Sequence, residues 1–176
     1  VQWSDQGMLA AFKFIQKFWF LHNEIKKIPN NRNQIENETV KINEELNAFT
    51  NKTIERITYN LDNFHYNVII ANLHETYNFL VKIIKLNPSK ILLLENYIKI
   101  LKIMSPIIPH LTSECLQDLG EKNLYNWPDI NKKYLEKNII DLVFQLNGKK
   151  RGIIKCEKEI DEKKLIDNIK NNDLYK

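Results

Sequence analysis

Three adjacent cations near the C-terminus have the clearest capacity for chemistry. Lys149, Lys150 and Arg151 directly follow Asn147-Gly148, a pair that favours a two-residue β-hairpin turn because both residues tolerate positive φ. A narrow β-ribbon places such cations on one short surface, where they can pair with phosphates, and an arginine can bind one phosphate through two hydrogen bonds. The alternative is that the lysines protect an exposed strand edge from aggregation. These residues are therefore candidates for contact with nucleic acid.

A second pair of cations lies near the N-terminus. Lys13 and Lys17 are four residues apart, on the side of a predicted helix away from its apolar stripe. They can reach phosphates, although ordinary solvated lysines need no such role. Aromatic residues can stack on bases, but on an apolar helix stripe they usually belong to the core. The residues concerned are Trp3, Trp19, Tyr66 and Trp127.

The chain carries no pattern of a catalytic or metal centre. It has no glycine-rich phosphate loop and no nucleophile motif, and Asp62-x-x-His65 is a single pair where a di-metal site needs two. Cys115 and Cys156 are far apart without Cys-x-x-Cys spacing, which argues against a disulfide framework and a zinc site. We therefore predict no catalytic residue, no metal ligand and no bound cofactor, in a reducing cytoplasm.

The remaining titratable residues favour structural roles. His22 and His110 fall near predicted helix seams, where a hydrogen-bonded histidine is more common than a catalytic one. The carboxylates of one long helix most simply form its solvated face. They are Glu36, Glu38, Glu44, Glu45 and Glu55. The sequence thus favours a binding module over an enzyme active site.

The composition agrees with a cytoplasmic chain outside the membrane. Of 176 residues, 43% are apolar and 27% are charged, with a net charge of only +4, so bulk basicity is weak support for nucleic-acid binding. No apolar run approaches the roughly 18 to 20 residues that span a bilayer, and no secretory signal is present. The chain begins with Val1 at a helix entry, so we expect a preceding portion and treat it as a fragment.

Helical periodicity dominates the first two thirds of the chain. Ser4 and Asp5 are good N-caps for a helix from about Gln6 to Lys26. Its predicted core stripe is Met8, Phe12, Ile15, Trp19 and His22. Further helices are expected over about 35–62, 64–85, 89–105 and from there to Gly120, separated at Pro29, Pro88 and Pro106. Short connections between such helices predict an antiparallel bundle over residues 1–125.

The pattern changes after Pro128. Alternating apolar residues from Ile140 to Leu146, the turn, and Ile153-Ile154 predict two strands, and Asp161 is a cap for a following helix. We predict a linker over 126–137 and a small α/β domain, a β-hairpin plus helix, over 138–176. Because a hairpin with one helix is a marginal core, we expect that domain to be truncated. The predicted fold class is mainly α.

Four segments, in order, resemble leucyl-tRNA synthetase, a class I aminoacyl-tRNA synthetase of bacterial type. The first is WSDQG at 3–7, and the second is KTIERIT at 52–58 followed by YNVIIANL at 66–73. The third, SPIIPH at 105–110, is shared with the isoleucyl, valyl and methionyl enzymes. The fourth, VFQLNGKKRG at 143–152, is similar to the segment that distinguishes the leucyl enzyme.

Some positions depart from the pattern of this family. Tyr66 and Val68 replace phenylalanine and threonine conservatively, whereas Ser113 and Leu116 stand where glutamate and tryptophan are usual. The resemblance nevertheless covers nearly the whole chain. It also agrees with the order of helices and hairpin derived from periodicity alone.

The resemblance implies a helical bundle of the class I anticodon-binding type that binds tRNA(Leu), as part of a cytoplasmic, monomeric enzyme. It implies that Lys149, Lys150, Arg151, Lys13 and Lys17 contact the tRNA. An upstream catalytic domain, with ATP and Mg²⁺, would form leucyl-adenylate and transfer the leucyl group. The alternatives are the corresponding region of an isoleucyl, valyl or methionyl synthetase, or a free-standing helical interaction module.

Overall fold

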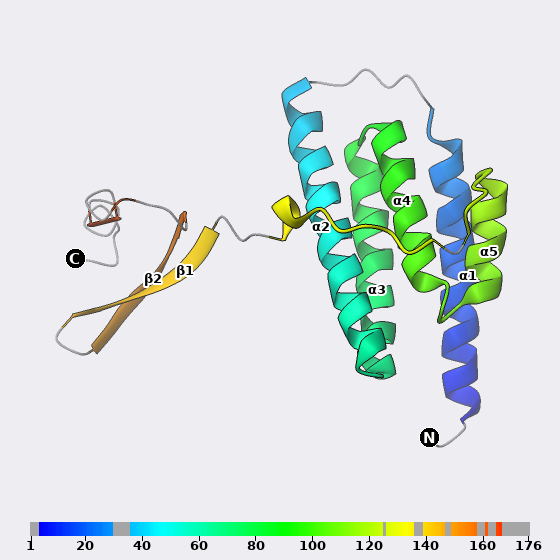
Figure 1. Cartoon of the computed structure of the whole chain (residues 1–176), viewed down its shortest axis with the longest axis horizontal. Helices are drawn as coiled ribbons and strands as arrows, with labels where there is room; N and C mark the ends of the chain where they lie inside the picture. The colour runs from blue at the N-terminus through cyan, green and yellow to red at the C-terminus, as the bar shows by residue number, and fades with distance from the viewer. Residues whose placement is uncertain are drawn as a thin grey trace. The chain divides into compact units, whose positions relative to one another are not determined.

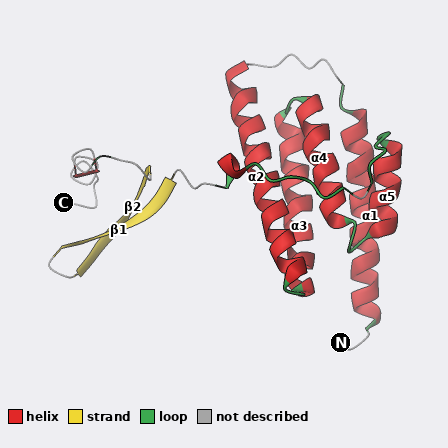
Figure 2. Cartoon of the chain, viewed as in Figure 1, coloured by secondary structure: helices red, strands yellow, loops and turns green. Residues whose placement is uncertain are grey.

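The computed structural model describes residues 4–29, 36–124, 126–135, 139–146, 149–157, 161 and 165–166. The chain divides into two compact units, Val1–Lys132 and Lys133–Lys176, each of which is described by itself. In the described residues, the first unit contains the long helices and the second contains both strands (Figure 2). This arrangement confirms the predicted fold class, a mainly helical chain in which a bundle precedes a β-hairpin.

The described part of the first unit contains five α-helices, and successive long helices run in alternating directions (Figure 1). The first begins where predicted, because the side chain of Ser4 accepts a hydrogen bond from the amide of Gly7 at 3.2 Å. The elements are α1 (Asp5–Lys27), α2 (Glu36–Asp62), α3 (Tyr66–Ile83), η1 (Ile84–Leu86), α4 (Lys90–Met104), α5 (Pro109–Asp118) and η2 (Lys132–Tyr134).

Prolines and residues with positive φ lie where one helix ends and the next begins. Asn87 adopts a φ of 56° directly before Pro88, which separates η1 from α4. Pro109 occupies the first turn of α5, where its missing amide costs nothing. Gly120 follows α5 with a φ of 75°, a conformation that side chains with a Cβ rarely adopt.

The core lies where these helices meet. Helix α2 packs against α3 and α4, and α5 packs against α4 and α1. Phe18 and Tyr97 are both fully buried, and their rings stack with centroids 6.2 Å apart. Phe49 of α2 stacks on Phe79 of α3 at 3.7 Å. Residues more than 60 positions apart are thus joined in one apolar interior.

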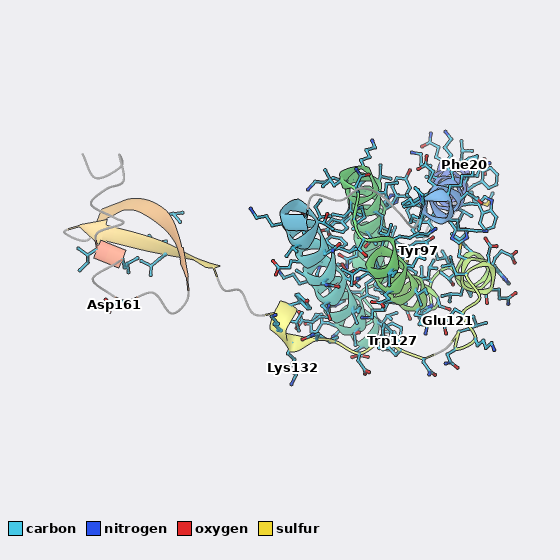
Figure 3. All side chains as sticks on the ribbon, turned by 90° about the horizontal axis from the view of Figure 1, so that it is seen from above. Phe20, Tyr97, Glu121, Trp127, Lys132 and Asp161 are labelled. Atoms are coloured by element: carbon cyan, nitrogen blue, oxygen red, sulfur yellow. The ribbon has the colours of Figure 1, made fainter. Side chains whose placement is uncertain are left out.

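The predicted core stripe of α1 was wrong for its first two members. Met8 is 50% exposed and Phe12 is 58% exposed, while Ile15 and Trp19 are half-buried. The buried residues are Phe14, Phe18, Leu21, His22 and Ile25. The physical reason is that α1 is apolar on two sides: one side faces the core, and the other carries Met8, Phe12 and Phe20. Figure 3 shows Phe20 at the outer edge of the bundle.

The second unit contains an antiparallel hairpin of β1 (Ile139–Leu146) and β2 (Lys149–Glu157). Leu146 pairs with Lys149, so two residues lie between the strands; that predicted turn, Asn147-Gly148, is outside the described residues. Leu142 is half-buried and Val143 is exposed, as expected for alternation along a strand. Of the predicted helix after Asp161, the structure describes Leu165–Ile166 as helical.

Candidate nucleic-acid interface

The three hairpin cations lie at the start of β2. Lys149 pairs with Leu146 and Lys150 with Gln145, whereas the next pair is Gly152 with Phe144. Arg151 is therefore the extra residue of a β-bulge and has no partner on β1. A bulge interrupts the alternation of a strand and increases its twist. The structure thus confirms that these residues are adjacent on a hairpin, and it adds an irregularity that the sequence pattern did not predict.

The two cations of α1 are exposed and one turn apart. Lys13 and Lys17 form no ion pair with any residue in the described part of the chain. They belong to the first unit, whereas the hairpin cations belong to the second, so the structure does not bring the two groups into one described site. Their contact with RNA stays a prediction.

The candidate stacking aromatics have different environments. Trp19 is half-buried and stacks on His22, with ring centroids 5.4 Å apart. Tyr66 is 51% exposed at the start of α3, and Trp127 is 40% exposed. Trp3 lies outside the described residues. Stacking on bases is untested for all four.

Residues 126–131, here called the strap, cross the bundle after α5 (Figure 1). The indole Nε1 of Trp127 donates to Thr58 Oγ1 of α2 at 3.0 Å. The backbone amide of Asn131 donates to Asn51 Oδ1, also on α2, at 2.7 Å. The first half of the segment predicted as a linker, 126–137, is thus held on a helix, and the compact units divide after Lys132.

Arg56 forms a polar bridge between α2 and α3. Its guanidinium donates to both carboxylate oxygens of Glu75, at 3.2 and 2.7 Å, and to Oδ1 of Asn72 at 2.6 Å. Arg56 and Glu75 are about half exposed, but Asn72 is only 3% exposed. Among the residues that the structure describes, the amide nitrogen of Asn72 has no hydrogen-bond partner. Arg56 therefore satisfies the buried Oδ1 of Asn72, whereas the amide nitrogen of the same side chain is unsatisfied.

His22 is the centre of a buried network that joins three helices. Its Nε2 lies 2.9 Å from Asp118 Oδ2 of α5, and its Nδ1 lies 3.2 Å from the hydroxyl of Tyr97 of α4. Because a carboxylate only accepts, Nε2 carries the proton, and in the neutral ring Nδ1 accepts from Tyr97. Lys26 also donates to Asp118. The hydrogen bond from Lys26, which has the larger effect, and the hydrogen bond from His22 both lower the pKa of Asp118.

Two weaker acids complete this network. Burial, and then its interaction with Cys115, raises the pKa of Tyr97 far above its usual value. Burial likewise raises the pKa of the Cys115 thiol to about 11, although the hydrogen bond with Tyr97 acts in the opposite direction. Both groups are therefore protonated at neutral pH. Their role is structural rather than nucleophilic.

The prediction for the histidines was right for His22 and wrong for His110. His22 is fully buried and hydrogen-bonded, whereas His110 is exposed. His110 lies in the first turn of α5, and the buried residues of that helix come later, at Thr112, Cys115 and Leu116. Of the predicted solvated carboxylates, Glu44, Glu45 and Glu55 are exposed, and the side chains of the other two are outside the described set.

Within the described residues, no three histidine, cysteine or acidic side chains gather as metal ligands would. In the same part of the chain, no helix combines the length and apolar character needed to cross a membrane. An open hollow beside the strap is lined by lysines and carboxylates together, among them Lys99, Lys102, Glu95 and Glu121. Such mixed charge does not define an anion site. The candidates for phosphate contact therefore stay the cations predicted from the sequence. They are Lys13 and Lys17 of α1 and Lys149, Lys150 and Arg151 of β2.

Comparison with known proteins defines the class. The family model described as the anticodon-binding domain of tRNA ligase matches residues 43–166, which include most of the bundle and both strands. The chain belongs to this family of anticodon-binding domains. Within it, the relatives described next are ligases for leucine.

The chain is 34% identical over 173 residues to a leucine–tRNA ligase of Prochlorococcus marinus, covering 95% of this chain and 20% of the relative. It is 32% identical to that of Orientia tsutsugamushi, covering 89% of this chain and 18% of the relative. It is 28% identical to that of Clostridium kluyveri, covering 99% of this chain and 22% of the relative. The chain thus spans about a fifth of the length of the curated relatives it matches.

A solved structure has the same fold. It is the crystal structure of a ternary complex of Agrobacterium radiobacter K84 agnB2 LeuRS with tRNA and LeuAMS, with a TM-score of 0.73 and 19% identity. The match covers 99% of this chain and 23% of that chain. At this identity the likeness establishes the fold, and the role of each residue needs separate support.

The sequence prediction missed the residues of α2 that hold the strap and Asn72. A signal was available, since Arg56 and Thr58 lie in the KTIERIT segment at 52–58. Asn51 and Thr58 are seven residues apart, so they lie on the same side of a helix. Their partners, Asn131 and Trp127, are distant in sequence, and periodicity carries no information about such contacts.

Proposed function

We propose that this chain is the tRNA-binding part of a leucine–tRNA ligase. The observation that carries the proposal is its similarity to leucine–tRNA ligases along 95% of its length, through both the bundle and the hairpin. The rest of the ligase would activate leucine with ATP and Mg²⁺ and transfer the leucyl group to tRNA(Leu). The chain itself contributes no catalytic residue and binds no cofactor in this proposal.

The hairpin cations supply the main phosphate contact of the proposal. Lys149, Lys150 and Arg151 are consecutive in β2, and three adjacent cations can neutralise two or three phosphates of one RNA strand. Lys13 and Lys17 would add a second contact on α1. Phosphate contacts hold an RNA without identifying its bases, so the bundle would read the shape of the tRNA rather than its anticodon sequence.

The proposal also concerns the setting in which the chain works. We infer a cytoplasmic enzyme, because tRNA charging takes place where tRNA is used. We infer a monomer in which the upstream catalytic domain of the same polypeptide is the chain's protein partner. In such a monomer, the hairpin and the bundle of one polypeptide bind the same tRNA molecule.

The test compares two steps of the full-length ligase. Changing Lys149, Lys150 and Arg151 together to alanine leaves leucine-dependent exchange of ATP and pyrophosphate unchanged, because that step needs no tRNA. Charging of tRNA(Leu) weakens, chiefly through a higher KM for tRNA. Equal loss of both activities would contradict a role in tRNA binding. Charging of isoleucine, valine or methionine tRNA instead would identify a sibling ligase.

A further inference from the structure

The first turns of α1 present an apolar surface that no described helix covers. Residues 4–13 are all exposed, and Phe14 is the first buried residue of the helix. Met8 is 50%, Leu9 is 52% and Phe12 is 58% exposed. Figure 1 shows the reason, since this end of α1 extends past α5, the helix that packs against it.

These three side chains form one patch. Met8 and Leu9 lie one turn before Phe12, at the spacings of four and three residues that bring side chains together on a helix. Single exposed apolar residues are common, but neighbouring ones indicate a contact surface. Most helical stability in proteins comes from packing of an apolar face, which this part of α1 lacks among the described residues. The three residues are here called the α1 patch.

We propose that the α1 patch is the docking site for the upstream part of the same polypeptide. This inference rests on the proposed function, in which a catalytic domain precedes this chain. The match covers 20% of a curated relative, so most of such a ligase lies outside the chain. Because α1 is the first element, upstream residues join the bundle at this end of α1 and are held beside the patch.

The charges around the α1 patch favour a protein surface over RNA. Residues 6–12 include no charged side chain, whereas an RNA backbone is bound mainly by lysine and arginine. Lys13 and Lys17 lie about 100° and about 140° around the helix from Phe12, at 3.6 residues per turn. Docking of protein on the patch therefore leaves both lysines available for tRNA. An apolar centre with few charges is also typical of a protein interface.

Photocrosslinking in the full-length ligase identifies the occupant. The photoreactive residue p-benzoylphenylalanine replaces Phe12, an exposed aromatic of similar shape, so the fold of the bundle is kept. Mass spectrometry of the crosslinked peptides should find partners upstream of Val1. The same replacement at Ile91, which is 73% exposed on α4, is the matched control and should give few crosslinks to upstream peptides.

Other outcomes assign the α1 patch to a different occupant and overturn the inference. Crosslinks that form only when tRNA is present would identify an RNA surface. Crosslinks between two ligase molecules, increasing with protein concentration, would identify a second copy. Crosslinks to residues after Lys132, or no more upstream crosslinks than the Ile91 control gives, would also contradict docking of the upstream part.

Hydrogen exchange gives a second measurement that starts from the unmodified ligase. If the α1 patch is covered, the amides of residues 9–13 exchange slowly, like those of the buried half of α1. Changing Met8, Leu9 and Phe12 together to alanine should speed this exchange at least about tenfold. Alanine is the strongest helix former, so faster exchange cannot come from a lower helix propensity. Equal exchange in wild type and triple variant would contradict docking on the patch.

A control variant and a charging assay complete the design. Val68→Ala with Ile70→Ala removes comparably exposed apolar side chains from α3, and should leave exchange of residues 9–13 unchanged. Charging of tRNA(Leu) tests the proposed function separately. A ligase that charges tRNA(Leu) without upstream crosslinks at position 12 would refute the docking inference alone, whereas a ligase that fails to charge tRNA(Leu) would refute the proposed function.

Discussion

Nε2 of His22 lies 2.9 Å from Oδ2 of Asp118, although 96 residues separate them in the chain. The contact joins the buried centre of α1 to the last residue of α5, and Lys26 donates to the same carboxylate. α5 has ten residues and buries Thr112, Cys115 and Leu116, and this polar contact at its last residue adds a direct link to α1. The contact should therefore affect the stability of the bundle.

Changing Asp118 to asparagine should remove an acid-sensitive part of the stability. Donation from Lys26, and then from His22, lowers the pKa of Asp118 in the folded chain, so the folded state favours the carboxylate. The stabilisation is present above the ordinary pKa of aspartate, and it is lost as pH falls through the lower, folded pKa. Thermal unfolding of wild type and Asp118→Asn should differ at about pH 6, and the difference should shrink as pH falls below the ordinary pKa of aspartate.

Asp62→Asn is the matched control for this experiment, since Asp62 is exposed at the end of α2 and has no ion pair among the described residues. Its melting curve should follow wild type throughout. A constant difference between wild type and Asp118→Asn at every pH would show that the carboxylate charge is not what stabilises α5.

Cys115 should resist alkylation in the folded chain. Its thiol is fully buried and its pKa is raised to about 11, so the reactive thiolate is rare at neutral pH. In a Cys156→Ser background at about pH 8, labelling by iodoacetamide should be more than about 100-fold slower than for an exposed cysteine with an ordinary pKa. Denaturant at the same pH should restore rapid labelling, and equally rapid labelling without denaturant would contradict the buried position.

Arg56→Ala should destabilise the bundle more than Glu75→Ala. The ion pair of Arg56 and Glu75 is about half exposed, so its loss should cost no more than about 0.5 kcal/mol. Removing Arg56 also removes the hydrogen bond to the buried Oδ1 of Asn72, which should cost a further amount of about 1 to 2 kcal/mol of unfolding free energy. Urea unfolding of the two variants measures the difference. Equal losses would show that Asn72 finds another partner, such as water.

The hairpin cations should contribute to the salt dependence of tRNA binding. Replacing Lys149, Lys150 and Arg151 with alanine should flatten the slope of log affinity against log salt by roughly 0.7 to 0.9 per lost phosphate contact. Lys13→Ala with Lys17→Ala tests the α1 contact in the same way. If the lysines only protect a strand edge, the triple variant gives a line parallel to wild type and lower solubility.

Local signals in the sequence were sufficient to place the elements. Ser4 begins α1 as predicted, proline separates the helices near 88 and 106, and the residues on either side of Asn147-Gly148 form a hairpin. These outcomes depend on caps, missing amides and turn preferences, which act within a few residues. The short motifs also indicated the family, because they extend over nearly the whole chain.

Contacts between elements were decided by the tertiary structure. The sequence determined that α1 has apolar residues on two sides, but only packing decided that Phe14 and Phe18 are buried while Met8 and Phe12 stay exposed. The pairing of Trp127 with Thr58 likewise needs the strap to return across α2. The physical reason is that periodicity reports which residues share a side of a helix, whereas burial depends on which other helix covers that side.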